Sequence, residues 1–303
     1  MSLKKTFRTY LELSKSGIVT LVLISVLGGY LIGQPMELPF SASRMLWTLL
    51  GVLFLSSGSS ALNQFQEQTE DASMPRTAGR PLPSGRMAPY QVLVFVGISL
   101  GLGLIILEWL DGRLLALGAA AAVFYNGFYT LWWKRRWAYA AIPGAIPGAI
   151  PILMGYTAAN GHVWTPGGIY LFLILFFWQM PHFWVLALRY QNDYALGKFP
   201  TLPVALGEDI TVLQIVLWCL AYVGLALGGP LFLPVGIIYL VVTIPMCLWL
   251  LWKLRLFVHA EAKTSGKAWL GFFLWVNFSL IIFIAAAALD IWHLHLMAPV
   301  WTK

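Results

Sequence analysis

Charged side chains are scarce in this 303-residue chain, in which Asp, Glu, Lys and Arg together make up 10% of the residues. Soluble domains carry roughly 25% charged residues, so the chain lacks the polar surface that a water-soluble protein needs. Hydrophobic residues make up 59% of the sequence. The composition therefore predicts an integral membrane protein and excludes a soluble enzyme, a nucleic-acid-binding domain and a disordered tail.

Cysteine and acidic residues are scarce as well. Cys219 and Cys247 both lie in apolar runs, so we expect no disulfide framework. The 12 Asp and Glu residues are outnumbered by 19 Lys and Arg residues. In a membrane protein this excess of base is interpreted from its position around the membrane, and we expect no nucleic-acid partner.

Long apolar runs, in contrast, are abundant. A membrane-spanning helix needs about 20 mostly apolar residues. The first run is too long for the core of a signal peptide, so we expect it to be retained. The sequence thus predicts an all-α integral membrane protein that forms one polytopic domain over residues 1–303. About nine spans are expected, at residues 18–33, 45–65, 90–109, 113–131, 138–157, 167–188, 210–228, 231–252 and 268–290.

The basic residues follow one side of this topology. When successive loops are assigned to alternate sides, 16 of the 19 Lys and Arg residues fall on one side. Basic residues are retained in the cytoplasm, so we expect a multi-pass protein of the cell inner membrane with its N-terminus inside and its C-terminus outside. The basic side holds Lys4, Lys5, Arg8, Lys15, Arg76, Arg80, Arg86, Lys134, Arg135, Arg136, Arg189, Lys198, Lys253, Arg255, Lys263 and Lys267, and the other side holds Arg44, Arg113 and Lys303.

An acidic cluster follows the second apolar run. Asn63, Glu67 and Asp71 recur every four residues, a spacing that stacks side chains on one face of a helix. Mg²⁺ is typically held by one or two carboxylates while substrate phosphates complete its shell. Arg76 and Arg80 follow shortly after, so carboxylates for a metal stand beside guanidiniums for a phosphate. This pattern favours a metal-bound diphosphate. The alternative is a solvated helix end whose acids pair with neighbouring arginines.

Two stretches, residues 63–86 and 178–204, carry specific motifs. The first contains Met-Pro-Arg-Thr and Arg-Pro-Leu, and the second contains Trp-Gln-Met-Pro-His-Phe-Trp and Asp-Tyr-Ala-Leu-Gly-Lys-Phe-Pro-Thr-Leu-Pro-Val. With the acids at their four-residue spacing, they resemble the protoheme IX farnesyltransferases, or heme O synthases, of the UbiA-type intramembrane prenyltransferase superfamily. The likeness covers roughly residues 13–215.

Four positions depart from the pattern of that family. Glu67 stands where the family usually has Asp, which lengthens a metal-binding side chain by one methylene. Asn192 stands before Asp193 where many members have a second Asp, so one charge is missing. Trp137 and Ala140 replace a usual Thr and Asn. These departures leave open an enzyme of the same superfamily that acts on another acceptor, such as an aromatic quinone precursor.

The resemblance implies Mg²⁺-dependent transfer of a farnesyl group from farnesyl diphosphate to a vinyl group of heme B, giving heme O. It implies two Mg²⁺ ions bound with the diphosphate and a central cavity open toward the cytoplasmic side. Mg²⁺ and basic side chains suit this reaction because negative charge develops on the leaving diphosphate. The partners expected are membrane lipid and heme or terminal-oxidase assembly proteins.

The resemblance also assigns roles to individual residues. The catalytic residues expected are Asn63, Glu67, Asp71 and Asp193, and these four with Asn192 are the expected metal ligands. For the basic run that begins at Lys134, a role in setting topology is the alternative. The expected diphosphate-binding residues are Lys15, Arg76, Arg80, Lys134 and Arg135.

Three further features carry weaker signals. His182 is a candidate heme-binding residue, and a hydrogen-bonded histidine in the protein interior is the alternative. A proline at every fourth position from Pro143 to Pro151 predicts backbone that faces the cavity, because irregular backbone at membrane depth needs protein or water beside it; a kinked packing helix is the alternative. The aromatic side chains expected to shield the prenyl carbocation from water are Trp178, Phe183, Trp184 and Tyr194.

Two readings outside the prenyltransferases also remain open. Broken helices and buried charge mark transporters, but a transporter would hold its acids near mid-membrane, whereas Glu67, Asp71 and Asp193 fall at the cytoplasmic ends of the expected spans. The other alternative is a heme-binding protein without transferase activity, because Asn192 leaves the expected metal ligands at positions 192 and 193 one charge short.

Overall fold

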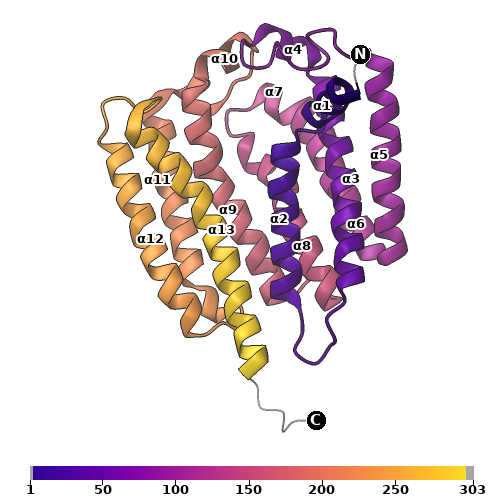
Figure 1. Cartoon of the computed structure of the whole chain (residues 1–303). Coiled ribbons are helices and arrows are strands. Elements are labelled where there is room, and N and C mark those ends of the chain that lie inside the picture. Colours follow the sequence, from indigo (N-terminus) through magenta and orange to yellow (C-terminus); the bar gives the residue numbers. More distant parts are fainter. Residues whose placement is uncertain (1–2, 298–303) are drawn as a thin grey trace.

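A computed structural model describes residues 3–297. Within that range nine helices are long and apolar enough to cross a membrane, and all nine predicted spans are confirmed (Figure 1). The fourth span is made by three consecutive segments, α6, η1 and α7. The spans are α2 (Ser16–Gly33), α3 (Ala42–Gln66), α5 (Pro89–Leu110), α6 (Gly112–Ala122) with η1 (Val123–Trp133) and α7 (Lys134–Arg136), α8 (Ala141–Asn160), α9 (Pro166–Arg189), α11 (Leu202–Leu227), α12 (Ile237–Val258) and α13 (Gly266–Met297).

Two predicted spans are displaced along the chain. The seventh, expected at 210–228, begins at Leu202, because Pro203 fits the first turn of a helix and a kink at Gly207 (φ 83°) joins this turn to the apolar run. The eighth, expected at 231–252, is α12, which begins at Ile237. The chain before α12 instead forms the short helix η2 (Gly229–Leu231).

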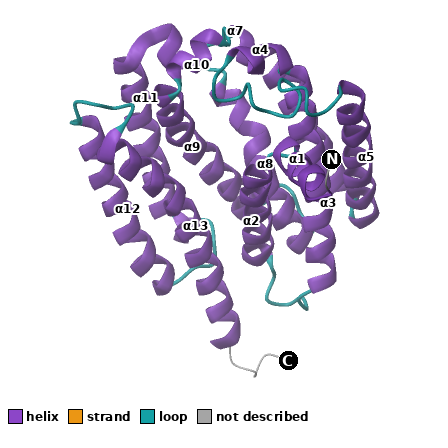
Figure 2. Cartoon of the chain, turned by 45° about the horizontal axis from the view of Figure 1, so that its top comes forward, coloured by secondary structure: helices purple, strands orange, loops and turns teal. Residues whose placement is uncertain are grey.

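Short helices and long loops gather at one end of the bundle. Figure 1 shows α1 (Leu3–Leu13), α4 (Gln68–Ser73) and α10 (Gln191–Leu196) at the same end as α7, and Figure 2 turns this end toward the viewer. These are the loops to which the sequence assigned most of the basic residues. Lys303, at the C-terminus, lies outside the described residues.

The spanning helices form a ring in chain order. Each packs against the next, and α13 closes the ring against α2. An additional contact of α2 with α8 crosses the ring and divides it into two lobes. This contact is close: a Cβ on Gly29 would overlap the carbonyl oxygen of Ile152, and a Cβ on Gly155 would overlap that of Val26. Small residues let helix backbones approach in membranes in this way.

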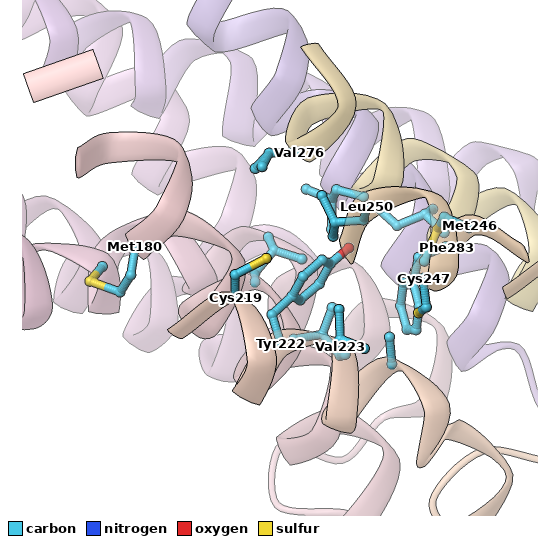
Figure 3. Packing of buried hydrophobic residues seen from close by; sticks show 14 of the residues in the cluster. Met180, Cys219, Tyr222, Val223, Met246, Cys247, Leu250, Val276 and Phe283 are labelled. Carbon is cyan, nitrogen blue, oxygen red and sulfur yellow. The ribbon is translucent and has the colours of Figure 1, made fainter. Parts of the chain in front are cut away.

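The two lobes differ in their interiors. The lobe of α9, α11, α12 and α13 is filled with apolar side chains, and Figure 3 shows Cys219 and Cys247 packed there beside Tyr222. Both cysteines are free thiols. The other lobe, built from α2, α3, η1 and α8 with the edge of α9, surrounds a cavity. We therefore look for chemistry in the lobe of α2, α3, η1 and α8, which surrounds this cavity.

Candidate active site

The cavity has a volume of about 410 Å³ and changes character along its length. Its apolar part is lined by Val19, Val22, Val52, Leu55 and Met154. Its polar end is lined by the acidic cluster that follows α3 and by basic residues from several elements. Gly144, Ala145, Pro147, Gly148 and Pro151 of α8 also line it, which confirms the prediction that the proline repeat faces the cavity.

The acidic cluster reaches the cavity through a break in the helix. A single helix through Asn63, Glu67 and Asp71 was predicted, and this prediction is wrong: α3 ends at Gln66, and Glu67 (φ −108°, ψ 15°) separates it from α4. The three side chains nevertheless converge on the cavity. Asn63 and Glu67 are each 2% exposed and Asp71 is 1% exposed. Such burial is costly for a carboxylate unless a cation is paired with it.

Each buried carboxylate is paired with one base. Lys134 donates to both oxygens of Glu67, with Nζ–Oε distances of 2.6 and 2.8 Å. Arg80 donates to both oxygens of Asp71 through Nη1, at 2.8 and 2.6 Å. Burial alone would raise the pKa of Glu67, but the charges of Lys134 and Lys15 outweigh it, so the pKa of this carboxyl lies below its ordinary value.

Lys15 differs from the other bases because its hydrogen-bond partner is neutral. Its Nζ lies 2.5 Å from Oδ1 of Asn63. Its backbone is left-handed (φ 52°, ψ 52°), a conformation that a lysine rarely adopts, and this turn between α1 and α2 aims the side chain at the cavity. Burial, and after it the charge of Arg80, lowers the pKa of Lys15 from 10.5 to about 7. Its ammonium is thus poorly compensated and suited to meeting an anion.

The acidic residue of the second motif, Asp193, lies at the rim of the cavity. Arg76 lines the cavity, and its Nε lies 3.9 Å from Oδ2 of Asp193, while its backbone N–H donates to the same oxygen at 3.3 Å. The Asp193 side chain is 18% exposed, and its neighbour Asn192 is exposed. The guanidinium of Arg76 also covers the ring of Tyr190, with its centre 4.8 Å from the ring centroid. The structure therefore brings Asp193 to the mouth of the cavity through Arg76 and leaves Asn192 outside.

Arg135 lies beside the cavity and does not line it. It forms an ion pair with Glu70 (Nη1–Oε1 2.5 Å) and donates to the backbone carbonyl of Gln66 at 3.0 Å. These contacts hold the start of α4 against α7. Arg135 thus contacts the backbone that carries the acidic cluster, at one remove from the cavity.

The aromatic candidates divide into two groups. Phe183 and Tyr194 line the cavity. Trp178 instead donates to the carbonyl of Val276 on α13, and Trp184 is fully buried. Two tyrosines that the sequence reasoning missed, Tyr125 and Tyr129, also line the cavity, with ring centroids 6.1 Å apart and rings nearly parallel. Their four-residue spacing beside Asn126 and Thr130 was the available signal.

His182 faces away from the cavity, between α9 and α13. Its ring stacks on Trp178 at 4.9 Å and lies 5.5 Å from Phe273, as measured between centroids. Asn277 of α13 also lies beside the ring, and Nδ1 has no hydrogen-bond partner among the described residues. The structure does not bring His182 together with the acidic cluster.

The polar end as it stands is a set of ion pairs. Among the described residues no three His, Cys, Asp or Glu side chains converge as a metal-binding group. An anion entering the cavity would compete with Glu67 and Asp71 for Lys134 and Arg80. The carboxylate oxygens released in that exchange would then be available to a hard cation. The geometry therefore suits an anion and a cation that bind together.

Known proteins share the sequence of this chain over most of its length. Residues 22–277 match the model of the UbiA prenyltransferase family. A Bdellovibrio bacteriovorus protein named protoheme IX farnesyltransferase is 46% identical over 94% of this chain and 97% of its own length. A protein of the same name from Aquifex aeolicus is 39% identical over 87% of this chain and 90% of its own length.

Solved structures share the fold. A structure described as digeranylgeranylglyceryl phosphate synthase superposes with a TM-score of 0.76, over 94% of this chain and 98% of that one, at 19% identity. A UbiA homologue from Archaeoglobus fulgidus bound to GPP and Mg²⁺ superposes with a TM-score of 0.70, over 93% of this chain and 99% of that one, at 16% identity. At these identities the likeness concerns the arrangement of the helices.

Proposed function

The chain belongs to the UbiA prenyltransferase family and is a multi-pass membrane prenyltransferase, and from this premise we propose that it makes heme O. In the proposed reaction it transfers the farnesyl group of farnesyl diphosphate to a vinyl group of heme B. The observation that carries the proposal is the 46% identity, over nearly the full length of both chains, with a relative named protoheme IX farnesyltransferase.

The cavity supports this assignment by its division into two parts. The polar end holds Lys15, Arg80 and Lys134 within one space, as a diphosphate requires. The apolar part continues from it between α2, α3 and α8 and offers aliphatic side chains to a prenyl chain. A substrate with a charged head and an apolar tail thus matches the cavity in both chemistry and direction.

Mg²⁺ bound with the diphosphate fits the donor set of this end. Asn63, Glu67 and Asp71 would hold it, because all three present oxygen atoms at the cavity wall and are nearly fully buried. The chemistry that such an ion supplies is stabilisation of the charge that develops on the leaving diphosphate. A second ion near Asp193 is part of the proposal and would share the mouth of the cavity with Arg76.

The bases exchange partners in this mechanism. Lys134 and Arg80 turn from Glu67 and Asp71 to the phosphate oxygens, and Lys15 turns from Asn63. Since these three side chains already line the cavity, the exchange needs rotations of side chains only. They orient the diphosphate and stabilise it as the bond to the farnesyl carbon breaks, when its negative charge increases.

The apolar wall excludes water from the farnesyl cation until the acceptor attacks. Tyr125, Tyr129 and Phe183 line the cavity, and the face of an aromatic ring attracts positive charge. The vinyl carbon of heme B forms the new bond to farnesyl, and water adds to the neighbouring carbon and loses a proton to solvent, giving the hydroxyethylfarnesyl group. His182 stays a candidate for contact with heme at the α9–α13 face.

The proposed location is the cell inner membrane, with the polar end of the cavity toward the cytoplasm. The charge bias of the loops supports this orientation, because the loops assigned to the basic side lie at the end of the bundle that holds α4 and α10 (Figure 2). Association with terminal-oxidase assembly proteins stays a prediction, and co-purification from native membranes would measure it.

The test is a reaction in lipid nanodiscs that contain the purified full-length chain. Farnesyl diphosphate, heme B and Mg²⁺ are supplied, and the products are separated by chromatography and identified by mass. We expect heme O and released diphosphate, both dependent on Mg²⁺. Prenylation of an aromatic quinone precursor in place of heme, or heme binding without release of diphosphate, would contradict the proposal.

A further inference from the structure

The fourth span contains an unusually wide helix beside the acidic cluster. Segment η1 (Val123–Trp133) is a π-helix, in which each backbone N–H bonds to the carbonyl five residues earlier. Long π-helices are rare, and π-helical turns often occur at functional sites. Here the wide helix turns Tyr125 and Tyr129 to the cavity and buries the other polar pair, Asn126 and Thr130.

The buried polar pair is bonded to the helix that carries the acidic cluster. Nδ2 of Asn126 donates to the backbone carbonyl of Ser59 at 2.9 Å, and the backbone carbonyl of Asn126 accepts from Nε2 of Gln66 at 3.1 Å. Thr130 is 0% exposed, and its hydroxyl oxygen accepts from Nδ2 of Asn63 at 3.1 Å. The π-helix thus contacts α3 on both sides of Asn63 and directly at it.

The hydroxyl of Thr130 acts both as a hydrogen-bond donor and as an acceptor. It donates its proton to the carbonyl of Tyr125 at 2.8 Å, a bond that runs five residues back along the wide helix. A threonine hydroxyl has one proton to give, so toward Asn63 it can only accept. The group of Asn63 that faces Thr130 must therefore be its NH₂ group.

Lys15 fixes the other side of the same amide. With the NH₂ group of Asn63 facing Thr130, its amide oxygen faces Lys15, and Nζ of Lys15 donates to this oxygen at 2.5 Å. Lys15, Asn63, Thr130 and Tyr125 form a chain in which every donor meets an acceptor. Rotating the amide by half a turn would set donor against donor at Lys15 and acceptor against acceptor at Thr130.

We infer that Thr130 is a positioning residue: its hydroxyl holds the Asn63 amide oxygen toward the cavity, and binding of a divalent cation with the diphosphate depends on it. Lys15 cannot do this alone, because the proposed function, on which this inference rests for the role of Asn63, moves Lys15 to the phosphate. Once Lys15 has moved, Thr130 is the group that keeps the oxygen aimed at the cation.

The test measures cation binding with no turnover. The purified full-length chain in nanodiscs is titrated with Mn²⁺ in the presence of farnesyl thiolodiphosphate, an unreactive analogue, and bound Mn²⁺ is read by electron paramagnetic resonance. Groups that orient a metal ligand typically contribute 10- to 100-fold to affinity. We expect Thr130→Val, which keeps the shape and removes the hydroxyl, to weaken Mn²⁺ binding about 10-fold or more, and Thr130→Ser to restore it to within about threefold.

Two controls separate positioning from loss of structure. Thr48→Val removes another fully buried hydroxyl, which donates to the carbonyl of Arg44 at the opposite end of α3, and it is expected to leave Mn²⁺ affinity unchanged. In an Asn63→Ala background, Thr130→Val is expected to change the affinity less than about twofold, because the group it positions is gone.

Two results would overturn the inference. One is Mn²⁺ binding by Thr130→Val as tight as that of the parent chain. The other is a loss of equal size with and without Asn63, because that loss would come from general damage to η1. Failure of the proposed function has a separate signature. If the parent chain binds Mn²⁺ with the analogue and shows the Thr130 dependence but makes no heme O, the role of Thr130 is supported and heme B is contradicted as the acceptor.

Discussion

Buried or half-buried acids paired with arginine or lysine occur at both ends of the bundle, and the two ends use them differently. At the cavity end, Arg80 and Lys134 bond to Asp71 and Glu67, and all four line the open space. At the far end, Asp111 pairs with Arg44 at 3.3 Å and with Arg113 at 2.7 Å. The chemistry of the pairs is similar, so the difference lies in what else each base contacts.

At the far end, both arginines also bond to the backbone of α8. Arg44 donates from Nε to the carbonyl of Ala158 at 2.7 Å, and Arg113 donates to the carbonyl of Gly161. Asp111 in turn caps the start of α6 by accepting from the backbone N–H of Arg113. These bonds tie α3 and α6 to the C-terminal end of α8. At the cavity end the bases meet carboxylates and an open space, so a ligand can replace the carboxylates.

This comparison predicts that the same substitution of Asp by Asn lowers activity strongly at the cavity end and little at the far end. Asp71→Asn removes a cavity carboxylate and the charge that compensates Arg80, and we expect farnesyl transfer to fall about 10²- to 10³-fold, as when an electrostatic group of an active site is lost. Asp111→Asn should retain activity within about twofold, because Asp111 pairs with Arg44 and Arg113 away from the cavity, a group that we call the far-end clamp. Product formation at saturating substrate, measured beside the unfolding temperature, separates the two.

The comparison breaks if the pattern is reversed. An active Asp71→Asn chain would show that Asp71 serves Arg80 only as a structural partner. A folded Asp111→Asn chain without activity would show that the far-end clamp controls the cavity from a distance.

A smaller effect is expected from the length of the acid at position 67. Glu67→Gln keeps the size of the side chain and loses the charge that Lys134 and the cation require, so we expect a loss of about 10²-fold in activity. Glu67→Asp keeps the charge and carries the residue that the family usually has, so activity should stay within about tenfold of the parent chain. The apparent Mg²⁺ affinity is the measurement that resolves them. Equal activities for the two variants would show that charge at this position is not used.

The rim should respond less than the cavity wall. Asp193 is partly exposed and acts on the cavity through Arg76, and ion pairs in such positions contribute little to stability. We expect Asp193→Asn to lower activity about tenfold, with most of the effect in the KM for farnesyl diphosphate. Asn192→Ala, at an exposed neighbour, should change neither constant by more than about twofold. A loss at Asn192 equal to that at Asp193 would place both in a second metal site.

The sequence predicted much of the fold because apolar length is a local property. Nine runs of about the right length were enough to find the nine spans among residues 3–297, whereas the side of the membrane assigned from the charge of the loops stays a prediction. The start of α11 was less accurate because Pro203 fits the first turn of a helix inside what reads as a polar loop, and the start of α12 was less accurate because the residues before it form η2. The acidic cluster was found from its spacing, although the spacing belongs to a helix that breaks at Glu67.

The partners of these acids could not be predicted in the same way. Lys134 reaches Glu67 across 67 positions of sequence, and Thr130 reaches Asn63 across the same separation. Such contacts depend on the π-helical register of η1, which no local pattern in an apolar span announces. The sequence indicated which side chains could do chemistry, and the packing of η1 on α3 decided how they are oriented.

The smallest expected effect concerns the far-end clamp and the pH. Hydrogen bonds from Arg113 are the largest cause that lowers the pKa of Asp111, from 3.8 to about 2. A carboxyl whose pKa is lower in the folded state contributes stability above its unfolded pKa, and this contribution is lost as the pH falls through the folded value. The unfolding temperature of the parent chain should therefore fall between about pH 4 and pH 2, and that of Asp111→Asn should fall by less over the same window. A fall in the unfolding temperature of Asp111→Asn as large as that of the parent chain would mean that Asp111 is not the source of the pH dependence in this window.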